Sequence, residues 1–495
     1  MNTLRLHWCC AALAGLLTLN STLQAADDSA GWIPLFDGKT LAGWRASENQ
    51  GGFKVEDGAI TFSGKRSHLF YAGPVRNADF KNFEFSADVR TRPLANSGIY
   101  FHTKYQEKDF PKNGFEAQVA NTHLGAGGYV EMKKSGSLYG VRNLYKSMVK
   151  DNEWFNLRVS VRGKRIQIRL NDQLVVDYLE PENPVPDPSR PGRRVSHGTF
   201  ALQGHDPESK VSYKNIRVKP LPDDLPDDPA GPVRFDAVDE QIVKLSTGNY
   251  PLIDFHTHLK GGLTLEGVLQ HMFKTGINHG LAVNCGLGFA ITNDAGVEDF
   301  LKSLAGQPVF VGMQAEGREW PTLFSPATVA RFDYVFTDSM TIFDHRGKRA
   351  RLWINEEVEI PDKQAFMEHL VDTIVKILDR EPVDIYVNPT FLPDIIAKDY
   401  DALWTPERMQ RVVDAAKRND VAIELNSRYH LPRPQFVKLA KKAGLKFTLG
   451  TNNTDANLGR DEYGLEMIRE CGLTYKDFWM PKPDGQKPIQ VRRKP

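Results

Sequence analysis

The chain has 495 residues, a formal net charge of +1 at pH 7 and four cysteines. This length predicts two or three domains. The near-neutral charge argues against a general nucleic-acid binder, which would show a strong basic excess. Cys9 and Cys10 lie in the N-terminal segment, so only Cys285 and Cys471 remain for the folded protein. One pair is no disulfide framework, and whether these two residues pair is left open.

Residues 1–25 have the pattern of a secretory signal peptide. Arg5 gives a positive start, residues 11–17 form an apolar core, and we expect cleavage after Ala25. The apolar core is too short to cross a membrane as a helix, and no later segment is apolar enough to do so. We therefore expect an exported protein, periplasmic or extracellular, without a membrane span.

Residues 29–219 are expected to form an all-β domain. Apolar and polar side chains alternate in residues 83–89 and 155–161, and tight turns follow at residues 162–164 and 171–172. This alternation with such turns is typical of antiparallel hairpins that bury one face. A region of this length favours a sandwich of two sheets.

Paired polar residues mark a candidate binding surface on these strands. Glu116 and Gln118 stand two residues apart, as do Gln203 and His205, so each pair shares one face of its strand. A solvated outer face would explain either pair alone. Two pairs favour a sugar-facing surface, because amides and aromatic rings suit the hydroxyls and C–H faces of sugars. Further residues of suitable type in this region are Tyr100, His102 and Tyr139.

A stretch rich in proline and aspartate, residues 220–245, follows the β region. This composition predicts an extended and fairly stiff linker. Because each half of the chain has a complete apolar pattern of its own, we expect two separable folding units. At the other end of the chain, residues 486–495 are expected to be a basic tail.

Residues 246–485 are expected to form a parallel α/β domain. Short apolar strands alternate with amphipathic segments, one of which begins at Thr405-Pro406, a typical helix start. Such βα units predict a parallel sheet that is buried on both faces. Seven strands favour a closed (β/α) barrel over an open doubly wound sheet. The expected strands are residues 252–258, 280–284, 308–312, 333–337, 383–388, 421–426 and 446–450.

The first of these strands contains two histidines that suggest a metal site. On a strand, His256 and His258 share a face with Asp254, and two imidazoles at this spacing can bind one metal ion. Glu316 and Asp338, which follow later strands, would help to hold it. The sequence is thus compatible with one divalent metal ion of unknown identity, and the alternative is a pair of hydrogen-bonded histidines without a metal.

Polar residues follow all seven expected strands at their carboxyl ends, where the sites of parallel α/β folds lie. A single residue there would be explained as a helix cap, but polar residues at every end favour a functional pocket. The amides among them are candidate substrate-binding residues, namely Asn388, Asn426, Asn452 and Asn453.

Ordered motifs throughout the β region resemble the 3-keto-disaccharide hydrolase family. They are residues 35–44 (Leu-Phe-Asp-Gly-Lys-Thr-Leu-Ala-Gly-Trp), 96–101, 114–119, 137–140, 154–156, 202–205 and 213–216. The resemblance implies a concanavalin-like sandwich and a link to 3-keto sugars. It leaves open whether the domain is catalytic, because this fold is also a common sugar-binding platform.

The second half resembles the polymerase and histidinol phosphatase (PHP) family, which are metal-dependent phosphoesterases on a seven-stranded barrel. The similar motifs are residues 253–258, 423–426 and 449–459. This chain departs from the family where metal ligands are usual, because asparagine and threonine are weak ligands beside carboxylate and imidazole. A full trinuclear centre is therefore not expected. Two alternatives stay open, namely one metal ion on His256 and His258, and a metal-free pocket rich in amides that binds a polyol. The departures are Asn284-Cys285, Met340, Asn388 and residues 451–454 (Thr-Asn-Asn-Thr).

The leading hypothesis is an exported carbohydrate-active enzyme that cleaves 3-keto-glycosides. A ketone at C3 acidifies the C2 proton, so a general base can remove it, and elimination or net hydrolysis at C1 follows. His205 and Glu116 are the catalytic candidates. The expected partner is a small-molecule or oligosaccharide substrate, whereas the aglycone, the anomer, the catalytic domain and the oligomeric state are left open. Candidate substrate-binding residues in the sandwich are Asn96, Gln118, Tyr139 and Gln203.

Two alternatives compete with this hypothesis. One is a metal-dependent hydrolase, such as a phosphoesterase, whose sandwich only holds a carbohydrate. The other is a carbohydrate-binding protein without catalytic activity.

Overall fold

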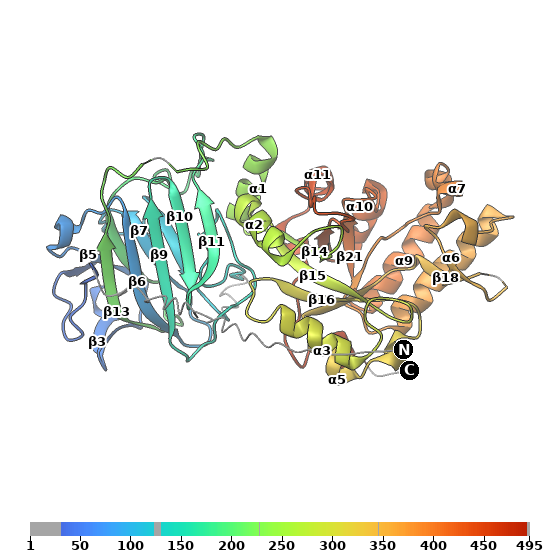
Figure 1. Ribbon diagram of the computed structural model, residues 1–495, viewed down its shortest axis with the longest axis horizontal. Helices are drawn as coiled ribbons and strands as arrows, with labels where there is room; N and C mark the ends of the chain where they lie inside the picture. The colour runs from blue at the N-terminus through green and yellow to red at the C-terminus, as the bar shows by residue number, and fades with distance from the viewer. Residues whose placement is uncertain (1–30, 123–129, 227, 345, 493–495) are drawn as a thin grey trace, which may run out of the picture.

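The computed structural model describes residues 31–122, 130–226, 228–344 and 346–492. Two antiparallel sheets form a sandwich, and a closed parallel barrel follows (Figure 1). The predicted fold class, a β-sandwich followed by a seven-stranded barrel, is confirmed. The expected signal peptide, residues 1–25, lies outside the described residues. Within the described residues, no helix is both long and apolar enough to cross a membrane.

The first sandwich sheet has the strand order β11-β10-β9-β6-β13-β4-β3, with β1 paired to β13. Its central strand β6 shows why the sequence pattern works, because Phe83, Phe85, Ala87 and Val89 are fully buried at alternate positions. The strands are β1 (Ile33–Pro34), β3 (Phe53–Glu56), β4 (Ala59–Phe62), β6 (Phe83–Thr91), β9 (Phe155–Arg162), β10 (Arg165–Leu170), β11 (Gln173–Leu179) and β13 (Val211–Pro220).

The second sandwich sheet has the order β2-β5-β12-β7-β8. Its inner side packs on the first sheet, where Phe200 contacts both Phe83 and Phe85. Its other side carries the polar pairs noted in the sequence. The strands are β2 (Trp44–Ala46), β5 (Ser67–Tyr71), β7 (Ser97–Thr103), β8 (Phe115–Val119) and β12 (Thr199–Gly204), and short 3-10 turns are η1 (Gln50–Gly52) and η2 (Val75–Ala78).

The barrel closes in chain order, each strand pairing in parallel with the next and β22 with β14. Large side chains fill its interior, including Phe255, Tyr334 and Phe336. All seven strands lie where the sequence predicts them, within a few residues. They are β14 (Ile253–Thr257), β15 (Asn278–Cys285), β16 (Phe310–Ala315), β17 (Tyr334–Thr337), β20 (Ile385–Tyr386), β21 (Ala422–Asn426) and β22 (Phe447–Gly450).

Helices cover the outside of the barrel. In α9 (Pro406–Arg418) the Thr405 side chain caps the first turn by accepting a hydrogen bond from the Arg408 amide, and Met409, Val412 and Val413 are buried. The other helices are α1 (Ala237–Thr247), α2 (Leu265–Thr275), α3 (Asp294–Ser303), α4 (Trp320–Leu323), α5 (Pro326–Val329), α6 (Lys363–Arg380), α7 (Asp394–Ala397), α8 (Tyr400–Leu403), α10 (Pro434–Ala443), α11 (Glu462–Glu470) and α12 (Pro488–Val491). A small hairpin, β18 (Thr341–Phe343) and β19 (Arg349–Arg351), and the 3-10 turns η3 (Asn355–Glu357) and η4 (Tyr475–Asp477) complete the domain.

Two expectations about the connecting segments need correction. The extended linker does not run to residue 245, because Asp236 forms a capping box with Asp239 and starts helix α1 at Ala237. The C-terminal residues are not a free tail, since Lys487 donates to the carbonyl oxygens of Ala330 and Phe332. Proline content and local charge therefore did not predict that both segments form ordered contacts with the folded domains.

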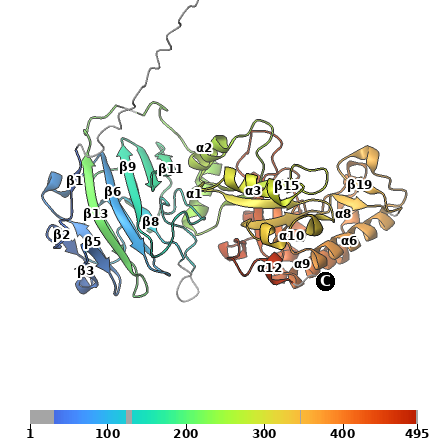
Figure 2. The same cartoon turned by 60° about the horizontal axis from the view of Figure 1, so that its bottom comes forward.

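The two domains share a polar interface (Figures 1 and 2). Helices α1 and α2 lie at the junction in both views. The sandwich residue Arg142 donates to the carbonyl oxygens of Phe273 and Lys274 at the end of α2, at 2.9 and 2.6 Å. Tyr145 donates to the Tyr250 carbonyl at 2.8 Å, and its ring joins the cluster inside the barrel. Because Tyr250 precedes β14, the sandwich covers the amino end of the barrel and leaves the carboxyl end on the opposite side.

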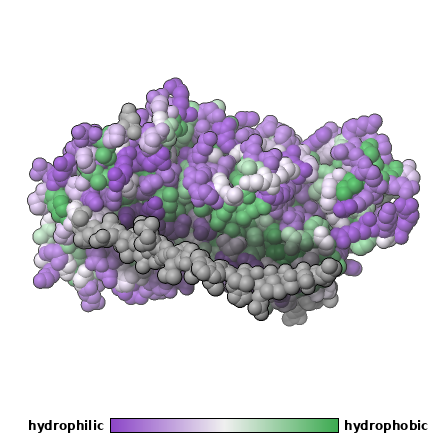
Figure 3. Space-filling view, in the orientation of Figure 1, coloured by the Kyte–Doolittle hydropathy of each residue, from purple (hydrophilic) through white to green (hydrophobic). Residues whose placement is uncertain are grey.

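Figure 3 shows the hydropathy of one face of the molecule. The outer ends of the molecule are mainly hydrophilic on the face shown, and hydrophobic residues gather nearer the middle. Cys285 and Cys471 are both buried and free, so they do not pair.

Candidate functional site

The predicted polar pairs of the sandwich meet on the outer side of the second sheet. Glu116 on β8 accepts hydrogen bonds from the Tyr100 hydroxyl at 2.9 Å and from the Gln203 amide at 3.0 Å. Strand β7 lies between Gln203 on β12 and Glu116 on β8. Gly98 on β7 permits this reach, because a Cβ there would lie 2.4 Å from a Glu116 carboxylate oxygen. Glycine at this position thus lets the carboxylate cross a whole strand.

Arg190 brings a positive charge to the same carboxylate. Its guanidinium lies 3.2 Å from Glu116 Oε2 and stacks 4.5 Å from the centre of the Tyr139 ring. Burial raises the pKa of the Glu116 carboxyl, and the Arg190 charge acts in the opposite direction. Arg190 was not predicted, because it comes from the proline-rich loop after β11, which had no regular pattern. The Tyr139 ring thus contacts a cation here, and its role in binding a sugar stays a prediction.

His205 forms a histidine–aspartate pair near this buried cluster. Its Nδ1 lies 2.7 Å from Asp206 Oδ2, and its ring packs 5.4 Å from the Phe110 ring. Burial raises the pKa of Asp206, but hydrogen bonds from His205 and Ser209 outweigh this and hold it below its ordinary value. With Nδ1 donating to Asp206, Nε2 is the acceptor nitrogen. The imidazole side chain is 28% exposed, so a substrate can reach it.

Several buried polar atoms of the pocket have no partner among the described residues. His68 on β5 lies opposite Gln203 in the sheet register and is fully buried, yet neither of its ring nitrogens is hydrogen-bonded. Burial lowers the pKa of His68 to about 3, so the ring is neutral. Gln118 donates to Asn96 at 3.2 Å, but its own oxygen, like that of Gln203, is also unpaired. Unpaired buried polar groups at one place are typical of a ligand site.

His68 was not predicted, because all five residues of β5 are buried and no alternation marks the face. His102 was misplaced as well. That residue bonds the Lys81 carbonyl and the Ser196 amide, and its ring packs against Phe83. A positive φ of 54° at His102 turns the strand there, so the side chain joins the core rather than the pocket.

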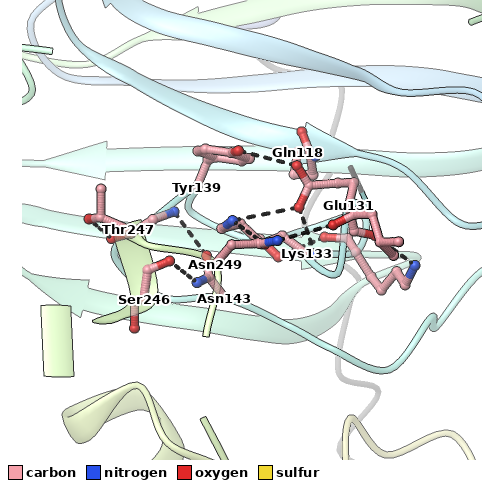
Figure 4. A network of polar contacts seen from close by, with 12 residues as sticks. Gln118, Glu131, Lys133, Tyr139, Asn143, Ser246, Thr247 and Asn249 are labelled. Carbon is pink, nitrogen blue, oxygen red and sulfur yellow. Dashed lines mark hydrogen bonds and ion pairs between the residues drawn. The ribbon is translucent and has the colours of Figure 1, made fainter. Parts of the chain in front are cut away.

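A second group of charges borders Tyr139 (Figure 4). Lys133 lies 4.6 Å from the centre of the Tyr139 ring and 3.6 Å from Glu131. Its ammonium donates to Asn249 Oδ1 at 2.8 Å. Burial lowers the pKa of Lys133, and the Glu131 charge acts against this. Asn249 follows helix α1, so the segment that leads into the barrel supplies one residue of this network in the sandwich.

The residues predicted to bind a metal ion have protein hydrogen-bond partners. His256 Nδ1 lies 2.6 Å from Glu424, and His258 Nδ1 donates to the Ala282 carbonyl at 2.9 Å. Glu316 and Asp338 accept hydrogen bonds from asparagine side chains, those of Asn284 and Asn388 respectively. In the part of the chain that the structure describes, no group of three or more His, Cys, Asp or Glu residues is placed to hold a metal. A histidine that is held at Nδ1 can still bind a metal through Nε2, so a metal ion on His256 and His258 stays a prediction.

The predicted amides at the carboxyl end of the barrel do come together. Asn388 Oδ1 accepts hydrogen bonds from both Asn426 and Asn452 at 3.0 Å, and Asn426 also donates to Glu424 at 2.9 Å. Asn453 has a structural role, because it exchanges hydrogen bonds with the backbone of His258 and fixes the loop after β14. Asparagines thus stand where a metal site would need anionic or imidazole ligands.

Glu316 and Asp338 at this barrel end influence each other. Burial and the Asp338 charge together raise the pKa of Glu316 to about 8. Burial likewise raises the pKa of Asp338. The pair therefore retains a proton at neutral pH, and its net charge is below that of two carboxylates.

Residues 31–219 match the family model described as the 3-keto-alpha-glucoside-1,2-lyase-like domain. A curated 3-keto-disaccharide hydrolase of Bacteroides thetaiotaomicron is 28% identical over 183 residues, which covers 32% of this chain and 61% of that protein. The chain thus matches less than two thirds of the length of this relative. Both findings confirm the family resemblance of the sandwich and support a carbohydrate hydrolase or lyase.

Similar solved structures exist for both halves. A carbohydrate-binding module from Bacillus subtilis has 17% identity and a TM-score of 0.25, covering 36% of this chain and 95% of the module. Histidinol phosphate phosphatase from Lactococcus lactis, in complex with zinc, histidinol and phosphate, has 12% identity and a TM-score of 0.37. The match covers 49% of this chain and the whole of that protein.

Proposed function

We propose that the sandwich domain, which matches the 3-keto-alpha-glucoside-1,2-lyase-like model, cleaves 3-keto-glycosides in the pocket around Glu116. The observation that carries this proposal is the buried cluster of Glu116, Arg190 and Gln203 beside the His205–Asp206 pair. It combines a base that a substrate can reach, a cation beside the floor of the pocket, and unpaired acceptors for hydroxyl groups. These are the parts that proton abstraction next to a ketone requires.

The proposed reaction begins at C2 of the oxidised sugar. His205 Nε2 accepts the C2 proton, and the C–H electron pair forms a C2=C3 bond while negative charge moves to the C3 oxygen. The C3 carbonyl then re-forms, a C1=C2 bond forms, and the C1–O bond breaks. The leaving oxygen takes up a proton, which gives an enone and an alcohol. Addition of water across C1=C2 converts this elimination into net hydrolysis, and no oxidant is consumed.

The other residues have supporting roles in this proposal. The Arg190 guanidinium stabilises the negative charge that develops on the C3 oxygen, because a fixed cation in a buried site costs little reorganisation. Glu116 holds Arg190 and accepts a hydrogen bond from a sugar hydroxyl. Gln118 and Gln203 accept further hydroxyl protons through their unpaired oxygens. The neutral His68 ring lies among them and contacts the bound sugar.

We also propose that the protein acts after export, because of the leader pattern in residues 1–25. The substrate would then be a small oxidised glycoside or an oligosaccharide outside the cytoplasm.

The test is a product assay with the purified full-length protein. A methyl 3-keto-glucoside and its unoxidised parent are incubated in D2O, and the products are followed by mass spectrometry and by the ultraviolet absorbance of the enone. We expect release of methanol only from the keto compound, together with either the enone or a hydrated product that carries deuterium at C2. Equal cleavage of the unoxidised glucoside, or a hydrated product without deuterium at C2, would contradict the mechanism.

A further inference from the structure

The outer face of the first sandwich sheet carries a cluster of cations around Trp32. In the sheet register, Ser86 on β6 lies between Arg217 on β13 and Arg158 on β9. Both guanidinium groups contact the Trp32 ring, at 4.7 and 5.6 Å from its centre. Arg169 on β10 is the next residue in the same row. The row thus places three arginines side by side across four neighbouring strands (Figure 1).

A second cluster of cations lies further along the same strands, around Trp154. Arg90 on β6 and Lys214 on β13 contact its ring, at 4.6 and 4.2 Å from the centre. Arg90 is four residues from Ser86, so the two clusters lie about 13 Å apart along the strand. A single sugar ring is shorter than this separation. A ligand that contacts both clusters therefore has more than one unit.

The carboxylates at the rows next to these clusters are paired with other arginines. Glu84 accepts a hydrogen bond from Arg162 at 2.6 Å, and Asp177 accepts one from Arg165 at 2.8 Å. Within the described residues, several cations of the two clusters form no ion pair, namely Arg90, Lys214 and Arg217. The face therefore has an excess of positive charge, which attracts an anionic partner.

Between the two clusters the face is hollowed and polar. A hollow of 440 Å³ is lined by Asp88, Asn156 and Asn215, among other residues. Asp88 accepts hydrogen bonds from both asparagine side chains, at 2.9 and 2.6 Å. Asp37, which also lines the hollow, accepts from backbone amides of its own loop. These carboxylate and amide oxygens suit hydroxyl groups, which donate hydrogen bonds, and they disfavour an anionic group inside the hollow.

We propose that this face binds an acidic polysaccharide, a sugar chain that carries carboxylate groups. The clusters around Trp32 and Trp154 hold the carboxylates, because guanidinium and ammonium groups form charge-assisted hydrogen bonds with them. The hollow binds the hydroxyl groups that a sugar chain presents between its anionic groups. The pocket around Glu116 lies on the other sheet, on the opposite side of the sandwich, so this proposal does not depend on the reaction proposed there.

Binding of the full-length protein to hyaluronan tests this proposal, because that polysaccharide carries a carboxylate on every second sugar. Dextran is the neutral comparison, and DNA and vesicles of anionic lipid are comparison polyanions. We expect hyaluronan to bind at least about tenfold more tightly than each of the others, and less tightly as salt rises. The proposal is overturned if dextran, DNA or the vesicles come within about tenfold of hyaluronan, or if salt has no effect.

Paired substitutions test each cluster separately. Arg158→Gln with Arg217→Gln removes the cations beside Trp32. Arg90→Gln with Lys214→Met removes those beside Trp154. Each pair should weaken binding of hyaluronan about tenfold or more, the scale of a lost charge-assisted hydrogen bond.

The matched control removes the same charge from the barrel. Lys398→Met with Lys442→Met neutralises two exposed lysines there and should leave the affinity for hyaluronan unchanged. Melting temperatures show whether the variants fold, and the single substitutions Arg217→Gln and Lys214→Met replace a pair that unfolds. If the cluster variants bind hyaluronan as tightly as the control, the proposal is wrong.

Discussion

The two domains bury carboxyl groups in different ways. In the sandwich, the Glu116 carboxylate lies 3.2 Å from the Arg190 guanidinium and also accepts from a tyrosine and a glutamine. At the barrel end, Glu316 and Asp338 accept from asparagine amides, and in the described residues no cation pairs with either side chain.

This difference has a chemical consequence. The Arg190 guanidinium opposes the rise in the pKa of Glu116 that burial causes, whereas the Asp338 charge adds to the rise in the pKa of Glu316. The sandwich cluster therefore places a cation beside a buried carboxyl group, and such a cation suits stabilisation of a developing enolate. The barrel end instead places two carboxyl groups among asparagine amides. Each prediction below tests one part of this contrast.

The largest expected effect is on catalysis in the sandwich. His205→Ala should lower kcat on a 3-keto-glucoside about a hundredfold or more, the usual scale for loss of a general base, and change KM little. Glu116→Gln should lose less, because the amide still accepts hydrogen bonds. The matched control is His197→Ala, which removes an exposed histidine that also bonds an aspartate, Asp79, at 2.8 Å. Full activity of His205→Ala in a stopped assay would move the chemistry out of the sandwich.

A smaller effect is expected at the junction between the domains. Asn249→Ala removes the acceptor of the Lys133 ammonium, so we expect kcat/KM to fall about three- to tenfold, the scale of one buried hydrogen bond. Asn249→Asp should restore most of the activity, since it keeps the acceptor and tolerates the positive φ of 67°. Asn152→Ala controls for backbone strain, because Asn152 has a φ of 66° away from the pocket. Equal losses in Asn249→Ala and Asn249→Asp would show that Asn249 does not position Lys133.

The smallest effect concerns the stability of the barrel. The folded-state pKa of Glu316, about 8, lies above its unfolded value, so folding favours the protonated form. Its contribution is fully present below the unfolded pKa and is lost as the pH rises through 8. Glu316→Gln should therefore have a melting temperature a few degrees above that of the wild type at pH 9 and little different at pH 5. Thermal unfolding of both proteins at both pH values measures this effect. If the melting temperatures of the variant and the wild type differ by the same amount at pH 9 and at pH 5, the proposed charge coupling is wrong.

Much of the fold and part of the site followed from local patterns. The seven barrel strands were predicted within a few residues, because short apolar runs between amphipathic segments indicate buried strands. The spacing of Glu116 with Gln118 placed both on one face of a strand, and the structure brings Gln203 to the same carboxylate. The metal candidates show the limit of local spacing. The sequence placed His256 and His258 on one face of a strand, but it did not show that His256 bonds Glu424, which is 168 residues away in the chain.

The sequence by itself determined which segments form strands and helices, because burial repeats with the period of each element. Only the tertiary structure decided which side chains meet. Arg190 lies 74 residues from Glu116 in the chain, and Asn249 reaches Lys133 from the other domain. Such contacts depend on the order and register of strands and on how loops pack. No local period encodes these, since they arise from the shape and hydrogen bonding of the whole folded chain.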